Sequence, residues 1–136
     1  PTTRPGGSGT SRITDSAGTL WLDVGQRRWS EEVLAACGLG IEHMPVLHEG
    51  PEITGRLRRE IAGLWGMDTV PVAAGGGDNA AGAIGVGVVR EGDALLSLGT
   101  SGVIFVATDA FRPNPRGAVH AFCHAVPGTL PVASTA

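Results

Sequence analysis

The sequence predicts an α/β fold, and three observations lead to this class. A short apolar run at 69–74 contains strand-forming residues. It is followed by three glycines and then by a run of small residues at 79–89 that suits a helix. Two helix patterns precede this unit. Two β-rich runs follow it, on either side of a short glycine-containing turn. A strand, a glycine turn and a helix in succession, with further helices before them, are typical of layered α/β domains.

The first half of the chain predicts a short strand and two helices. Residues 18–24 carry strand-forming side chains. In "WSEEVLAACGLG", Ser30 is a candidate N-cap, two glutamates suit the first turn, and glycines can end the helix. Prolines keep 44–55 extended, and 56–67 predicts the second helix. We expect all three tryptophans to lie in the core or at its edge: Trp21, Trp29 and Trp65.

The second half predicts a buried strand, a tightly packed helix and a hairpin. The strand covers 69–74, and the helix of small residues covers 79–89. Each glycine inside that helix costs about 1 kcal/mol relative to alanine, so we expect the helix to pack closely against a neighbouring element. The runs 94–98 and 103–107 flank the turn of the hairpin. The pattern after the hairpin, at 118–128, favours neither helix nor strand.

The composition suits one domain, or part of a larger protein, with a hydrophobic core. The chain has 136 residues, of which 42% are hydrophobic, and a net charge of −3. The arginines of "GRLRRE", at 55–60, are more typical of a solvated helix face than of a nucleic-acid patch. The longest apolar run, 80–89, is half of the about 20 residues that a membrane span needs. We therefore expect neither a nucleic-acid partner nor a membrane partner.

The cysteines and histidines predict neither a disulfide framework nor a metal site. Cys37 and Cys123 lie far apart in the sequence, which favours a reducing, cytoplasmic environment. His120, Cys123 and His124 lie close together, but a zinc site needs a further ligand and none is nearby. Residues 1–12 are polar and rich in glycine, contain no signal-peptide pattern, and predict a flexible tail.

Asp78 is a lone acid between the glycines and the small-residue helix, and two interpretations of it are open. As a helix N-cap, its carboxylate would accept backbone N–H groups of the first turn, worth about 1 kcal/mol. As a functional group, it would lie at the carboxyl end of a strand, where open α/β sheets bind ligands. Gly76 and Gly77 would then let a substrate approach, and the carboxylate could accept a proton from a hydroxyl. The local pattern alone favours the cap.

The segment "SLGTSG" at 97–102 also has two interpretations. It can be an ordinary hairpin turn. It can also be a phosphate cradle, with exposed N–H groups and two hydroxyls, formed by Gly99, Thr100, Ser101 and Gly102. The lysine of a P-loop is missing, and "GGGDNAAG" does not follow the dinucleotide-binding pattern.

Asp78 followed by "SLGTSG" resembles the FGGY carbohydrate kinases. The resemblance covers roughly residues 13–128 and is carried by the stretches "DSAGTLWLDV", "RRWSEEVLAACGL", "MPVLHEGPEITG", "VPVAAGGGDNAAGAIGVGVV", "LSLGTSGVIF" and "AVHAFCHAVPG". The resemblance implies a ribonuclease H-like, actin-like ATPase fold, of which this chain holds a part. Residues 13–92 would end the first, sugar-binding domain and 93–130 would begin the second, nucleotide-binding domain. The tail 1–12 and the end 131–136 do not match.

The resemblance implies an ATP-dependent sugar kinase that works with Mg²⁺. Within the family, the matching words imply the phosphorylation of D-xylulose to D-xylulose 5-phosphate, with Asp78 as general base. Gly76, Gly77 and Asn79 would lie beside the sugar, and the ATP phosphates would lie on Gly99, Thr100, Ser101 and Gly102. The resemblance changes the favoured interpretation of Asp78 from cap to base.

Three expectations complete this prediction. The family's first phosphate motif and its adenine site do not occur in this sequence, so we expect an internal fragment that is inactive alone. The alternatives are a kinase of the same family for another pentulose or polyol, and a non-catalytic remnant or binding module. A homodimer is the assembly that we keep open.

Overall fold

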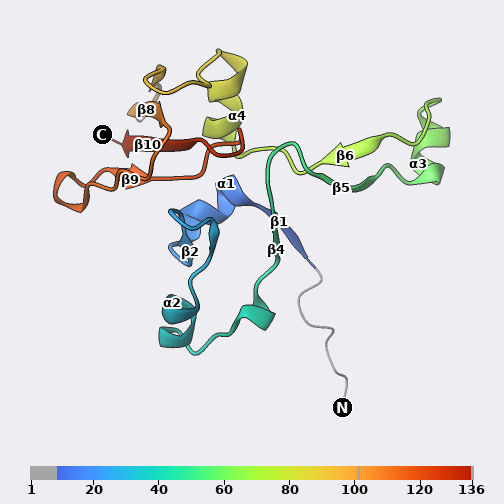
Figure 1. Cartoon of the computed structure of the whole chain (residues 1–136). Coiled ribbons are helices and arrows are strands. Elements are labelled where there is room, and N and C mark those ends of the chain that lie inside the picture. Colours follow the sequence, from blue (N-terminus) through green and yellow to red (C-terminus); the bar gives the residue numbers. More distant parts are fainter. Residues whose placement is uncertain (1–8, 101, 136) are drawn as a thin grey trace.

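The computed structural model describes residues 9–100 and 102–135, which form small sheets and short helices (Figure 1). The predicted α/β class is confirmed in the sense of a mixed α/β fold. The elements are β1 (Thr10–Arg12), α1 (Ile13–Ser16), β2 (Leu22–Asp23), β3 (Arg28–Trp29), α2 (Glu31–Ala36), β4 (Val46–His48), β5 (Ile53–Arg56), α3 (Arg59–Leu64), β6 (Pro71–Ala73), α4 (Asp78–Gly85), β7 (Ala94–Leu98), β8 (Gly102–Thr108), β9 (His120–Ala121) and β10 (Leu130–Thr135). Among the described residues, no helix has the length and apolar character to cross a membrane.

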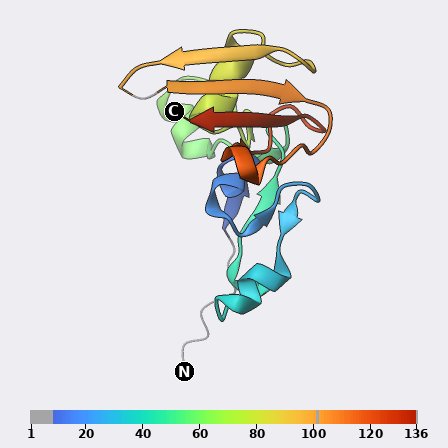
Figure 2. The same cartoon turned by 90° about the vertical axis from the view of Figure 1, so that its left-hand side faces the viewer.

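The largest sheet has the strand order β7-β8-β10-β9 and is antiparallel throughout. Figure 2 shows β7, β8 and β10 side by side, with α4 behind them. Phe105 and Ala107 of β8 pack with Ala83 of α4 in a small core. The predicted hairpin is confirmed, with Leu98 paired to Gly102. The predicted helix is also present, but it is shorter than expected because Gly87, at φ +84°, turns the chain out of the helix.

A second core joins the beginning of the chain to its last third. It contains Ile13, Leu22, Trp29 and Leu34 from the first half, together with Cys123. Helix α2 begins as predicted, since the hydroxyl of Ser30 accepts the N–H of Val33. Strand β2 is shorter than the expected strand 18–24, because α1 and a 3₁₀ turn occupy the preceding residues.

Strand β1 lies at the end of the segment expected to be a tail. It pairs in parallel with β4, with Thr10 opposite Val46 and Arg12 opposite His48. Residues 10–12 therefore belong to the fold. Their side chains are polar, so no apolar pattern marked them as a strand. Residues 1–8 lie outside the described part of the chain.

Strands β5 and β6 form a two-stranded ribbon that continues into α3 and extends to one side (Figure 1). The expectation of a buried strand at 69–74 is wrong, since every residue of β6 is exposed. Its strand pairing is with β5 alone, in a sheet of two strands. Trp65, which follows α3, was expected in the core or at its edge, and this expectation is also wrong, because Trp65 is 64% exposed. Trp29, by contrast, is 8% exposed.

Candidate active site

Asp78 is the first residue of α4, directly after β6 and the three glycines. Its Oδ1 accepts the N–H of Asn79 at 2.7 Å. Asp78 does not occupy the N-cap position, which is Gly77. It is the first helical residue, and its carboxylate still accepts one N–H of the first turn, that of Asn79. The exposed carboxylate lies at the positive end of the helix dipole.

The glycine loop before Asp78 is held by the segment that links β1 to α1. The N–H of Gly77 donates to Oγ1 of Thr14 at 2.8 Å. Nη1 of Arg12 donates to the carbonyl of Gly76 at 3.1 Å, and Nη2 of Arg12 lies 2.5 Å from the Asp15 carboxylate. These contacts join residues more than sixty positions apart and fix the backbone that carries Asp78.

Asp78 lines a pocket of about 140 Å³ whose lining includes both polar and apolar residues. Its lining consists of Thr14, Asp15, Gly77, Asp78, Asn79, Ala80, Phe105, Phe122 and Cys123. Gly76 is needed here for space, because a Cβ on it would lie 2.9 Å from Cβ of Ala125. A Cβ on Gly77 would lie 2.5 Å from Oδ1 of Asp15, the end of a half-exposed side chain that can turn away. Gly75, at φ +79°, supplies the left-handed turn instead.

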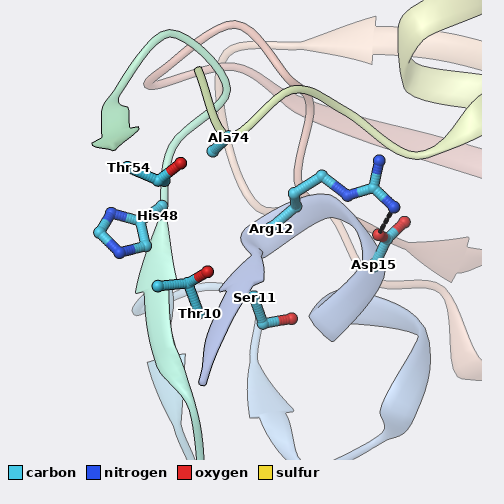
Figure 3. A pocket seen from close by; sticks show the side chains of 7 residues that line it. All are labelled: Thr10, Ser11, Arg12, Asp15, His48, Thr54 and Ala74. Atoms are coloured by element: carbon cyan, nitrogen blue, oxygen red, sulfur yellow. Dashed lines mark ion pairs between the residues drawn. The ribbon is translucent and has the colours of Figure 1, made fainter. Parts of the chain in front are cut away.

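A second, larger pocket of about 290 Å³ lies against the first and shares Asp15 with it (Figure 3). It is lined by Thr10, Ser11, Arg12, Asp15, His48, Thr54 and Ala74. Much of its polar chemistry is internally paired. Arg12 bonds Asp15, and Nδ1 of His48 lies 3.0 Å from Oε2 of Glu52.

The structure brings together one group of predicted site residues and leaves the other apart. Gly77, Asp78 and Asn79 line the first pocket, whereas Gly76 packs against Ala125 outside its lining. Gly99 and Thr100 are exposed after β7, and Gly102 begins β8. Ser101 lies outside the described residues. Of the described residues in this turn, Gly99, Thr100 and Gly102, none lines the pocket, although the lining reaches β8 at Phe105.

Two buried groups beside the pocket have displaced pKa values. Burial raises the pKa of the Cys123 thiol to about 11, although the nearby charge of Arg27 acts in the opposite direction. Burial lowers the pKa of His124, while the hydrogen bond to the Val88 carbonyl opposes the shift. His124 therefore packs as a neutral ring, with Nε2 facing that carbonyl at 3.1 Å and Nδ1 accepting the N–H of Val126 at 2.9 Å.

The described residues contain no group of three or more His, Cys, Asp or Glu side chains that could hold a metal ion. His124 uses both ring nitrogens for backbone contacts.

Sequence reasoning missed Arg12, Thr14 and Asp15 as site residues. They lie where β1 gives way to α1, and each contacts or borders the glycine loop. The available signal was the word "TSRITDS", in which hydroxyl and charged residues surround a single isoleucine. That isoleucine is 2% exposed and anchors the junction in the core.

Comparisons with known proteins place this site in a family. The model for "FGGY family of carbohydrate kinases, N-terminal domain" matches residues 6–85, more than half of the chain. Xylulose kinase from Escherichia coli (strain K12) is 59% identical over 117 residues, which cover 86% of this chain and 24% of the relative. Xylulose kinase from Klebsiella pneumoniae is 54% identical over 118 residues, with 87% and 24% covered.

A solved structure gives the same result. The crystal structure described as a xyloylose kinase from Brucella ovis superimposes with a TM-score of 0.89 at 54% identity, over 95% of this chain and 27% of that one. The chain spans about a quarter of the length of the curated relatives that it matches. The resemblance seen in the sequence is confirmed: the chain belongs to the FGGY family of carbohydrate kinases.

Proposed function

We propose that this chain is the part of an ATP-dependent sugar kinase that supplies the general base, Asp78, for the phosphorylation of D-xylulose to D-xylulose 5-phosphate. The observation that carries the proposal is the position of Asp78, at the start of α4 in a pocket that a glycine loop keeps open. The identity to two xylulose kinases supports the choice of sugar.

In this proposal Asp78 accepts the proton of the attacking sugar hydroxyl as that oxygen bonds to the γ-phosphorus of ATP and ADP leaves. Its Oδ1 holds the N–H of Asn79, and no described residue bonds its other oxygen, which is left for the substrate. Phosphoryl transfer relies on positioning and charge stabilisation, so the fixed backbone around Asp78 contributes as much as its basicity.

The donor set fits Mg²⁺ only as a partial site. Asp78 and Asp15 both line the pocket, but Asp15 is paired with Arg12. Mg²⁺ is commonly held by one or two carboxylates together with water and substrate phosphates, but the free oxygen of Asp78 is assigned to the sugar, so these two residues do not complete a site for the ion. When bound, the ion neutralises phosphate charge.

The remaining parts of the prediction follow from the same proposal. The chain would end the first domain of an actin-like ATPase fold at residue 92 and begin the second at 93. Gly99, Thr100, Ser101 and Gly102 would approach the ATP phosphates when the two domains close. The two unbridged cysteines support a cytoplasmic protein, and a homodimer is its proposed assembly.

A chimera tests the proposal. The matching 117 residues of the Escherichia coli xylulose kinase are replaced by those of this chain, and ATP-dependent phosphorylation is measured with D-xylulose and with a panel of other pentuloses and polyols. We expect activity that is highest with D-xylulose. A folded but inactive chimera would contradict the kinase proposal, and a preference for another sugar would replace the substrate. The isolated chain should show no phosphorylation above background.

A further inference from the structure

Arg27 occupies a backbone conformation that disfavours an arginine. It lies in the turn between β2 and β3, with φ +53°. In this left-handed region glycine is favoured, and other residues persist only where their surroundings hold them. A side chain retained at such a position points to a contact that glycine could not make.

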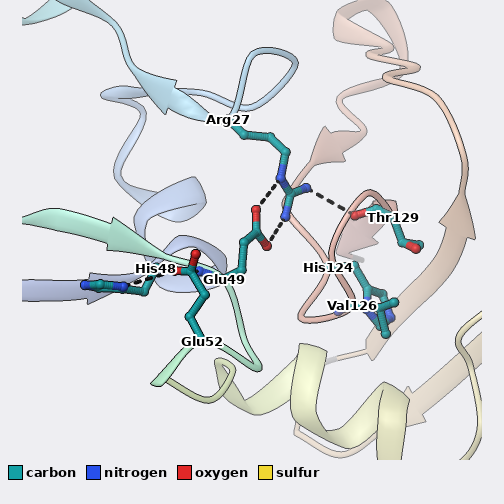
Figure 4. A network of polar contacts seen from close by, with 7 residues as sticks. All are labelled: Arg27, His48, Glu49, Glu52, His124, Val126 and Thr129. Atoms are coloured by element: carbon teal, nitrogen blue, oxygen red, sulfur yellow. Dashed lines mark hydrogen bonds and ion pairs between the residues drawn. The ribbon is translucent and has the colours of Figure 1, made fainter. Parts of the chain in front are cut away.

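The side chain of Arg27 makes that contact with two distant segments (Figure 4). Nε and Nη2 donate to the two carboxylate oxygens of Glu49, at 2.7 and 2.6 Å. Nη1 donates to the carbonyl of Thr129 at 3.3 Å. The Arg27 and Glu49 side chains are 19% and 24% exposed, so the forked ion pair is screened from water more than a surface pair.

The two partners of Arg27 border the loop that forms one wall of the Asp78 pocket. The Thr129 carbonyl also accepts the N–H of His124, which closes the loop 123–129 on itself. Within this loop, Ala125 lies directly against Gly50, the neighbour of Glu49, and against Gly76. The Gly50 carbonyl in turn accepts the N–H of Gly75, at 3.0 Å. Continuous contacts thus run from Arg27 to the glycines before Asp78.

We propose that Arg27 is a positioning residue, which clamps Glu49 to the Thr129 carbonyl and so holds the loop 123–129 against the glycines before Asp78. The inference rests on the proposed function only in treating this pocket as the site of phosphoryl transfer. Because Phe122 and Cys123 line the pocket, release of the clamp opens this wall and exposes the Cys123 thiol.

The test uses Cys123 as a probe of the pocket wall. Cys123 is 1% exposed, and the chain has one other cysteine, the exposed Cys37. In a Cys37→Ser background, we measure the rate at which the Cys123 thiol reacts with an aromatic disulfide reagent at pH 8, for the parent and for Arg27→Gly. We expect the reaction rate of Cys123 to rise by about ten-fold or more. This rise should exceed the increase expected from global unfolding, which is calculated from the stability of each variant in urea.

The sign of the effect separates the clamp from simpler explanations. Loss of the Arg27 charge alone would raise the pKa of Cys123, which burial has already raised, and so slow the reaction. If Arg27 served only to form the turn, Arg27→Gly would leave the reaction rate of Cys123 unchanged, since glycine suits the turn. Arg28→Ala is the matched control, because exposed Arg28 bonds Gln26 in the same turn, and its rate should equal the parent's.

An Arg27→Gly rate at or below that of the parent would overturn the proposal. If Arg27→Gly does not fold, Arg27→Lys carries the test, because it keeps the charge but not the forked geometry. A several-fold rise is then expected, and an unchanged rate would overturn the proposal. Neither measurement depends on kinase activity, so failure here leaves the assignment of Asp78 to be judged by the chimera.

Discussion

Replacement of Gly76 by alanine would place a methyl group 2.9 Å from Cβ of Ala125. Carbon atoms pack best at about 3.5–4.0 Å, so the loop 123–129 or the glycine loop would have to move by about half an ångström or more. Gly76 has no left-handed φ, so the cost comes from the contact alone. Overpacking of this kind costs about 1–3 kcal/mol.

Urea unfolding, followed by the fluorescence of buried Trp29, measures this cost. A loss of that size lowers the midpoint by about 1 M, since the slope for small proteins is about 1–3 kcal/mol/M. The second substitution Ala125→Gly removes the methyl group that clashes, so the pair should show a favourable coupling energy of about 1 kcal/mol or more in a double-mutant cycle.

Gly75→Ala is the control for backbone strain. Its new Cβ would lie 3.9 Å from Arg12, in ordinary contact, but the backbone is at φ +79°. It should lose about 1 kcal/mol, and Ala125→Gly should not restore it. A neutral Gly76→Ala, or one that Ala125→Gly fails to rescue, would refute the close packing of the glycine loop against this wall.

Two further predictions concern the residues that hold the site. Thr14→Val keeps the shape of the side chain but removes the acceptor of the Gly77 N–H, so stability should fall by about 1–3 kcal/mol in urea unfolding. Thr54→Val, which removes a solvent-exposed hydrogen bond to the Val72 carbonyl, should cost little. The folded pKa of His124 is lowered, chiefly by burial, so the unfolded chain takes up the proton first: stability is full above about pH 6.5 and falls as the pH drops below it. The loss of stability between pH 7.5 and 5.5 should shrink in His124→Gln and persist in His120→Gln, and equal losses in both would contradict this origin.

The sequence predicted the elements whose signals are local. Ser30 and the glutamates after it marked α2, and the β-rich runs marked the hairpin of β7 and β8. The start of α4 was predicted to within one residue, and that residue is Asp78. Gly77 takes the N-cap position, and Asp78, one residue later, bonds the first-turn N–H of Asn79 and lines the pocket.

The features that sequence reasoning missed depend on contacts across the chain. Strand β1 has no apolar alternation and is stabilised by pairing with β4. Thr14 supports the glycine loop from more than sixty residues away. The exposure of β6 and Trp65 could not be foreseen either, because an apolar pattern predicts burial without saying what covers the residues.

The central claim is that Asp78 is the general base of a sugar kinase, and Asp78→Asn in the active chimera tests it most directly. The amide oxygen of asparagine can still accept the N–H of Asn79, so the start of α4 should keep its structure. The measurement is kcat for ATP-dependent phosphorylation of D-xylulose, with KM for both substrates. The account predicts a fall in kcat of about 10²–10⁴-fold with KM nearly unchanged. A kcat within a few-fold of the parent chimera would contradict it.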